Sequence, residues 1–129
     1  MPTLVDTSVW IDLFADRPTA EVSRLKGLVG YEELLIGDLI LAELLQGVRS
    51  DQEATLIDTA FSAYPVVSLV GEVNARRSAA NYRALRRQGI TIRKTIDCLI
   101  ATWCISNHVP LLHNDRDFRP FTRQGLVEA

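Results

Sequence analysis

Four short apolar runs, separated by longer segments with helical spacing, constrain the fold of this chain most. The runs lie at residues 3–6, 33–38, 65–67 and 111–112. Between them, apolar residues recur with the period of amphipathic helices. Short apolar strands that alternate with helices indicate parallel pairing through right-handed crossovers. We therefore predict an α/β fold, a three-layer α/β/α sandwich with a central, mainly parallel sheet.

The helix boundaries are predicted from N-cap residues and from helix-breaking glycine and proline residues. Helices are expected at 8–15, 21–29, 39–48, 51–64, 71–88 and 96–107, and residues 125–127 are expected to add an edge strand. With 129 residues, 47% hydrophobic and 23% charged, the composition is that of a globular chain. This length accommodates one core and not two. We expect a single domain over residues 1–129.

Several features bear on the cellular location. Charges interrupt the longest apolar stretches, such as LIGDLILAELL, so no membrane span is expected. Acids come early at the N-terminus, and no basic region followed by an apolar stretch marks a secretory signal. Cys98 and Cys104 lie six residues apart in a helical pattern, which suits buried thiols better than a redox pair or a zinc site. We expect a cytoplasmic protein.

The net charge of −2 hides an uneven distribution. No acid occurs between Val73 and Ile96, and this stretch holds seven of the 14 cationic side chains: Arg76, Arg77, Arg83, Arg86, Arg87, Arg93 and Lys94. Such a face can bind phosphates, although most arginine stripes on helices are only solvated surface. Arg93 and Lys94 are the better candidates for RNA contact, because they directly precede the helix start at Thr95.

Four acids occupy positions that a parallel sheet would bring together. Asp6 and Asp115 follow apolar runs, and functional groups in such sheets gather beyond the carboxyl ends of the strands. Glu43 and Asp97 lie in helical segments, and Asp117 follows closely after Asp115.

Each acid also has a purely structural interpretation. Asp6 suits a helix N-cap, and Glu43 suits a solvated helix face. Asp97 opposes a helix dipole, while Asp115 and Asp117 suit turn positions. Each structural explanation is adequate for its own residue, but none explains why four acids occur at positions that a parallel sheet would bring together. The functional interpretation is that these carboxylates hold Mg²⁺ or Mn²⁺, which prefer oxygen ligands and make clustered like charges tolerable.

Three blocks, LVDTSVWID, LILAELLQGVRS and TIDCLIATWCISNHVPLLHNDRDF, occur in an order that spans nearly the whole chain. In these blocks the sequence resembles the PIN-domain ribonucleases, and among them the VapC toxins of bacterial toxin–antitoxin pairs. By position, Asp6, Glu43, Asp97 and Asp115 correspond to the acidic quartet of that family. The resemblance implies a Mg²⁺- or Mn²⁺-dependent endoribonuclease acting on RNA, homodimerisation, and inhibition by a cognate VapB antitoxin.

From these observations we assign roles to the acids. Asp6, Asp97 and Asp115 are predicted to bind the metal directly, with Asp117 as a further ligand. Glu43 is predicted to ligate through water or to orient the attacking water. All four quartet acids are assigned to catalysis.

The neighbouring side chains receive supporting roles or remain open. Ser8 is predicted to support Asp6 or its metal through hydrogen bonds, whereas Thr7 is assigned to the turn. His113 adjoins the site, so it is a candidate for a ligand or a proton-transfer group, although no second histidine lies at metal-ligand spacing. The alternative for the whole chain is a non-catalytic RNA- or protein-binding module on the same fold.

Overall fold

The computed structural model describes residues 1–129. Its strands are β1 (Thr3–Val5), β2 (Leu34–Gly37), β3 (Val66–Val67) and β4 (Leu111–Leu112). Its helices are α1 (Thr7–Phe14), α2 (Ala20–Leu28), α3 (Asp38–Gln46), α4 (Asp51–Phe61), α5 (Glu72–Arg87), α6 (Thr95–Asn107) and the 3₁₀ helix η1 (Arg116–Gln124). The strands and α-helices agree with the predicted segments to within a few residues.

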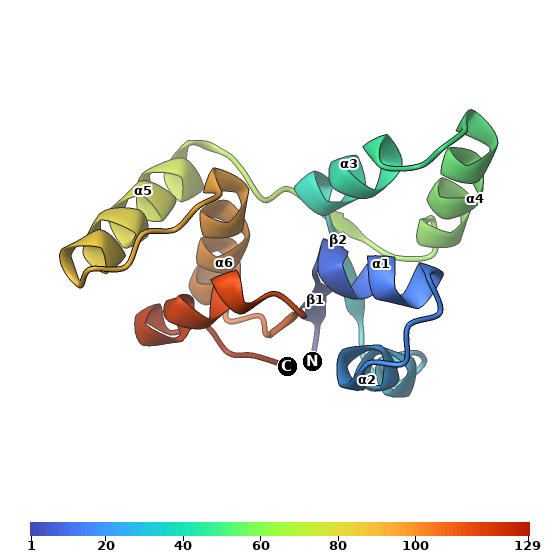
Figure 1. Ribbon diagram of the computed structural model, residues 1–129, viewed down its shortest axis with the longest axis horizontal. Coiled ribbons are helices and arrows are strands. Elements are labelled where there is room, and N and C mark those ends of the chain that lie inside the picture. The colour runs from blue at the N-terminus through green and yellow to red at the C-terminus, as the bar shows by residue number, and fades with distance from the viewer.

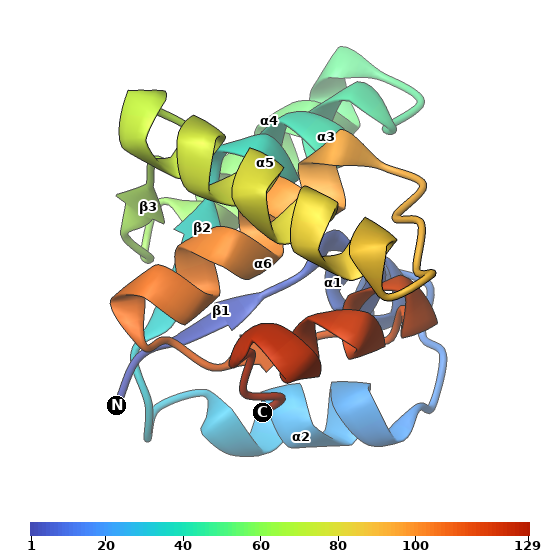
Figure 2. The same ribbon diagram turned by 90° about the vertical axis from the view of Figure 1, so that its left-hand side faces the viewer.

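All strand pairs are parallel, and the sheet order is β3-β2-β1-β4. In the central strand β1, Leu4 lies opposite Leu35 of β2 on one side and opposite Leu111 of β4 on the other. Helices α1 to α4 lie on one side of this sheet, and α5, α6 and η1 lie on the other (Figure 1). The view turned by 90° shows α5 and α6 in front of β1 (Figure 2). The predicted three-layer α/β/α sandwich is confirmed.

Three of the four strands, β1, β2 and β4, are buried on both faces. All residues of β1, β2 and β4 are buried, as expected for parallel strands covered by helices on both sides. On the η1 side, Phe118 and Phe121 are fully buried and anchor that helix. On the other side, the Trp10 ring contacts those of Phe14 and Phe61, so these aromatic side chains serve packing.

The predicted edge strand at residues 125–127 is wrong. Gly125 has φ +102° and ends η1, so the chain turns there instead of extending. The last residues reach the sheet only through a single parallel bridge, between Glu128 and Leu111. The prediction for the cysteines is confirmed, since Cys98 and Cys104 are free and buried. Burial raises the pKa of the Cys98 thiol to about 11.

None of the helices combines the length and the apolar character needed to span a membrane.

Gly37, at the end of β2, is the most closely packed glycine of the chain. A Cβ there would collide with the fully buried side chain of Leu69. We expect Gly37→Ala to lower the free energy of unfolding by about 1–3 kcal/mol through overpacking. Gly27, inside α2, has no atom within 4 Å of the corresponding position. The matched Gly27→Ala variant should gain about 0.5–1 kcal/mol in denaturant unfolding; equal effects at both sites would contradict this account.

Candidate metal centre

The acids predicted from the sequence lie at the carboxyl edge of the sheet. Asp6 follows β1 directly and is the N-cap of α1. Asp115 follows β4 and is the N-cap of η1. Asp97 lies in the first turn of α6, which begins at this same edge before the chain returns through β4. The parallel topology therefore brings residues more than 100 positions apart to one place.

Three of these carboxylates come together. One oxygen from each of Asp97, Asp115 and Asp117 lies within 4.8 Å of the other two. Asp97 is only 6% exposed, whereas Asp115 and Asp117 are half-buried. This acidic trio joins the N-terminal turn of α6 to the start of η1.

Asp97 is the least compensated member of the trio. Its Oδ2 atom is buried and has no hydrogen-bond partner. Burial raises the pKa of its carboxyl group to about 6, and the charges of Asp115, Asp6 and Asp117 add to that rise. A buried oxygen without a donor is rare in folded proteins and requires an explanation such as an ion.

Asp6 lies outside the trio but acts on it electrostatically. Its Oδ2 accepts hydrogen bonds from the Ser8 backbone N–H at 3.0 Å and from the Ser8 hydroxyl at 2.6 Å. Burial raises the pKa of Asp6, and the Ser8 bonds partly offset that rise. Ser8 thus supports Asp6 by hydrogen bonds, in the manner that the sequence suggested. Direct metal binding by Asp6 stays a prediction.

Glu43 extends from α3 and forms a hydrogen bond with Thr7, a residue assigned from the sequence only to the turn. The Thr7 hydroxyl donates a hydrogen bond to Glu43 Oε1 at 3.0 Å. Burial raises the pKa of Glu43, and the charge of Asp6 adds to that rise. Sequence reasoning missed this role of Thr7, although a hydroxyl directly after Asp6 in the DTS triplet was a usable signal.

The two predicted phosphate contacts differ in their surroundings. Arg93 Nη2 donates to both carboxylate oxygens of Asp117, at 3.0 and 2.9 Å. Lys94 has no ion-pair partner, and its charge lowers the pKa of both Asp97 and Glu43. Arg93 thus compensates the charge of Asp117, and Lys94 acts electrostatically on Asp97 and Glu43. RNA contact by either residue stays a prediction.

The arginine stripe of α5 is exposed opposite a buried residue, as its spacing predicted. Arg83 and Arg87 are exposed, and Leu85 is fully buried. Arg76 is partly neutralised, since it forms an ion pair with Glu72 one turn earlier. Nothing in these contacts distinguishes the stripe from solvated surface.

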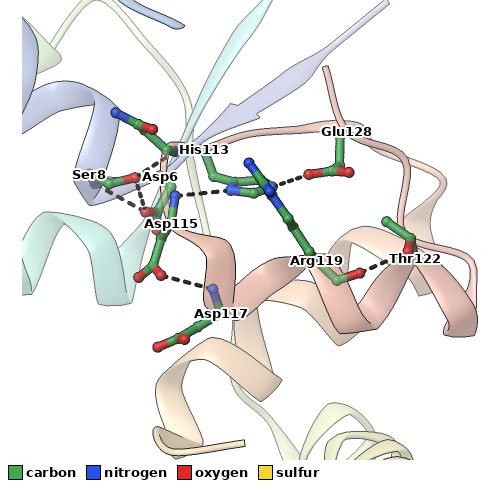
Figure 3. A network of polar contacts seen from close by, with 9 residues as sticks. Asp6, Ser8, His113, Asp115, Asp117, Arg119, Thr122 and Glu128 are labelled. Carbon is green, nitrogen blue, oxygen red and sulfur yellow. Dashed lines mark hydrogen bonds and ion pairs between the residues drawn. The ribbon is translucent and has the colours of Figure 1, made fainter. Parts of the chain in front are cut away.

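A polar network that the sequence did not reveal supports the loop between β4 and η1 (Figure 3). Besides its bond to Asp6, the Ser8 hydroxyl accepts a hydrogen bond from the Asn114 backbone N–H at 3.0 Å. The Asn114 side chain donates to Asp12, which also pairs with Arg17. Ser8 and Asp12 lie one turn apart on α1 and so hold the same loop residue. No motif or spacing pointed to Asn114 or Asp12.

The donor set suits a divalent cation. Carboxylate oxygens are the ligands that Mg²⁺ and Mn²⁺ prefer, and these ions keep several waters, so a few protein ligands are sufficient. The unpartnered Oδ2 of Asp97 lacks the partner that such an ion would provide. An ion bound to Asp97, Asp115 and Asp117 would also reverse the repulsion that raises the Asp97 pKa.

Comparisons with known proteins agree with this arrangement. The profile of the PIN domain matches residues 3–123. The VapC ribonuclease Mb1587 of Mycobacterium bovis is 30% identical over 128 residues, covering 98% of this chain and 96% of that protein. Ribonuclease VapC19 of Mycobacterium tuberculosis is 36% identical over 122 residues, covering 92% and 93%.

A solved structure shows the same fold. The structure of VapBC-1 from nontypeable Haemophilus influenzae matches with a TM-score of 0.78 at 23% identity, covering 100% of this chain and 97% of that one. The family profile and both relatives extend over more than nine tenths of the chain. The chain therefore belongs to the PIN-domain family, and to the VapC ribonucleases within it.

Proposed function

We propose that this protein is a Mg²⁺- or Mn²⁺-dependent endoribonuclease that hydrolyses RNA phosphodiester bonds, and the toxin of a pair that a cognate VapB antitoxin neutralises. The observation that carries the proposal is the acidic trio with its buried, unpartnered Asp97 oxygen. The relatives named as ribonucleases supply the reaction class.

The chain's own groups divide the work. Asp97 and Asp115 would hold the cation, with Asp6 and Asp117 as the further candidates. A divalent cation bound there would activate water and stabilise negative charge on the phosphate. Glu43 has one oxygen fixed by Thr7, which leaves Oε2 to accept the proton of the attacking water. The raised pKa of Glu43 makes it a stronger base than an exposed glutamate.

RNA reaches this centre past Lys94. This side chain is exposed and carries no ion pair, so it is available to a phosphate next to Asp97. Arg93 would first have to share its contact with Asp117. We assign the first phosphate contact to Lys94 and the second to Arg93.

An apolar groove beside the site suits the antitoxin. The groove, of about 470 Å³, lies between α1, α3 and α4 and is lined by Ile11, Phe14, Ala15, Glu43, Leu44, Gly47, Val48, Arg49, Glu53 and Ile57. Ile11 and Phe14 are each 45% exposed. Solved structures with this fold include VapBC-1 from Haemophilus influenzae and a toxin–antitoxin complex from Klebsiella pneumoniae. We assign the groove to an apolar segment of VapB, which would then lie against Glu43.

We further propose that the protein is a homodimer and that it is located in the cytoplasm.

Asp97→Asn keeps the shape of the side chain and removes one charge from the centre. We expect Mg²⁺-dependent cleavage of total RNA to fall by about 100-fold or more, since metal catalysis contributes several kcal/mol. Asp58→Asn is the matched control, because Asp58 is an exposed acid on α4. Newly formed RNA ends are mapped with Mg²⁺ and with EDTA. Undiminished cleavage by Asp97→Asn contradicts the site, and RNA retention without new ends favours a binding module.

The same residue predicts a dependence of stability on pH. The folded state raises the Asp97 pKa from 3.8 to about 6, so it binds that proton more tightly than the unfolded state. The resulting stabilisation is present below about pH 4 and is lost as the pH rises through about 6. In EDTA at pH 7.5, Asp97→Asn should therefore raise the free energy of unfolding, by at most about 3 kcal/mol.

Thermal unfolding in EDTA at pH 4 and at pH 7.5 tests this. The stabilising effect of Asp97→Asn should shrink at the lower pH, and saturating Mn²⁺ should raise the Tm of the wild type more than that of the variant. A variant less stable than the wild type at pH 7.5 in EDTA would show that the Asp97 charge is compensated within the protein.

The groove yields a separate prediction. Ile11→Glu places a charge on its lining and should weaken co-purification with the cognate antitoxin by at least about tenfold, through loss of buried apolar area. Val29→Glu is the control, because Val29 is 48% exposed and lies at the end of α2, away from the groove. Both variants should retain metal-dependent RNA cleavage. Full co-purification of Ile11→Glu would rule out the groove as the antitoxin site.

A further inference from the structure

We propose that His113 and Glu128 are positioning residues for the metal centre, and that the C-terminal segment thereby forms part of its scaffold. This inference rests on the proposed function, because it concerns the geometry of the metal ligand Asp115. It assigns to His113 neither metal ligation nor proton transfer.

The two nitrogens of the His113 ring are both engaged (Figure 3). Nδ1 lies 3.2 Å from the Asp115 backbone nitrogen, and Nε2 lies 2.6 Å from Glu128 Oε2. A backbone N–H can only donate, so Nδ1 accepts and the ring proton resides on Nε2. Nε2 then donates to the Glu128 carboxylate in a charge-assisted hydrogen bond. No lone pair of the ring remains for a metal or a substrate proton.

Glu128 is held in place by the sheet. The backbone N–H of Leu111 donates to the Val127 carbonyl at 2.9 Å, and the N–H of Ala129 donates to the Leu111 carbonyl at 2.9 Å. These bonds form the parallel bridge between Leu111 and Glu128. The C-terminal segment thus pairs with β4, the strand that leads to the loop with Asp115.

The His113 ring is itself immobilised. Its side chain is only 5% exposed, and its ring centroid lies 5.0 Å from that of Phe118 on η1. The hydrogen bond that Nε2 donates to Glu128 fixes Nδ1 as the nitrogen that faces Asp115. In metal sites, groups that hydrogen-bond to a ligand from behind fix the orientation of that ligand, and the His113–Glu128 pair has this place behind Asp115.

Three hydrogen bonds, two made by Asp115 and one by the preceding Asn114, consequently restrain the position of Asp115. Its backbone N–H is held by His113, and the preceding N–H of Asn114 is held by the Ser8 hydroxyl. Its Oδ1 accepts from the Asp117 backbone N–H at 2.9 Å. Of these three bonds, only the one that Asp115 donates to His113 depends on a residue from the C-terminal segment. Loss of Glu128 should therefore loosen Asp115 while the other two bonds persist.

The test measures Mn²⁺ affinity by electron paramagnetic resonance on purified full-length protein without RNA. Glu128→Ala should weaken Mn²⁺ binding about tenfold, the lower end of the range for groups behind a metal ligand. Glu128→Gln should retain most of the affinity, because its amide oxygen still accepts the bond from Nε2. Glu33→Ala is the matched control, since Glu33 is exposed and makes no side-chain hydrogen bond.

Folding is monitored in parallel by thermal unfolding. His113→Ala removes a buried ring and would destabilise the fold, so it is not used. The Glu128 side chain is 41% exposed, and its variants are expected to fold, which keeps the test decisive. Wild-type affinity in Glu128→Ala would overturn the positioning role and leave the metal centre standing. A wild-type protein that binds no Mn²⁺ would overturn the metal centre itself, and this inference with it.

Discussion

Burial of the Asp97 carboxylate beside Asp6, Asp115 and Asp117 opposes folding of the metal-free chain, because burial removes the hydration of its charge and the neighbouring carboxylates add repulsion. The parallel sheet is the cause of this arrangement. Its strands end at one edge, and the residues that follow β1 and β4 must lie side by side there. The fold thus creates the repulsion, and the hydrophobic core on both sides of the sheet provides the stabilisation that overcomes it.

The groups around the acids fall into those that donate to a carboxylate and those that fix the backbone. Ser8 and Thr7, adjacent in the chain, donate to Asp6 and to Glu43 respectively, so a single turn of α1 serves two carboxylates. Asn114 makes no hydrogen bond to an acid of the trio, but its backbone N–H donates to Ser8 and so holds the residue next to Asp115. A substitution in this turn would therefore disturb both sides of the cluster together.

The sequence predicted the sheet and the gathering of acids because both depend on chain order and hydrophobic period. The positions of Asp6 and Asp115 after strands, and of Asp97 at a helix start, followed from those patterns. The links from Thr7 to Glu43 and from His113 to Glu128 did not, because they depend on side-chain rotamers and on the register of the last residues. The edge strand at residues 125–127 failed for a local reason: the left-handed conformation of Gly125 breaks the extended run.

Asp97 and Asp117 differ in how their charges are compensated, and this difference ranks them as ligands. Asp117 already has a cation, since Arg93 contacts both of its oxygens. Arg93 is 68% exposed, and such ion pairs contribute little, so this contact can yield to a metal. Asp97 is buried, and its Oδ2 has no hydrogen-bond donor. A cation therefore gains most from Asp97 and least from Asp117, which makes Asp117 the replaceable member of the trio.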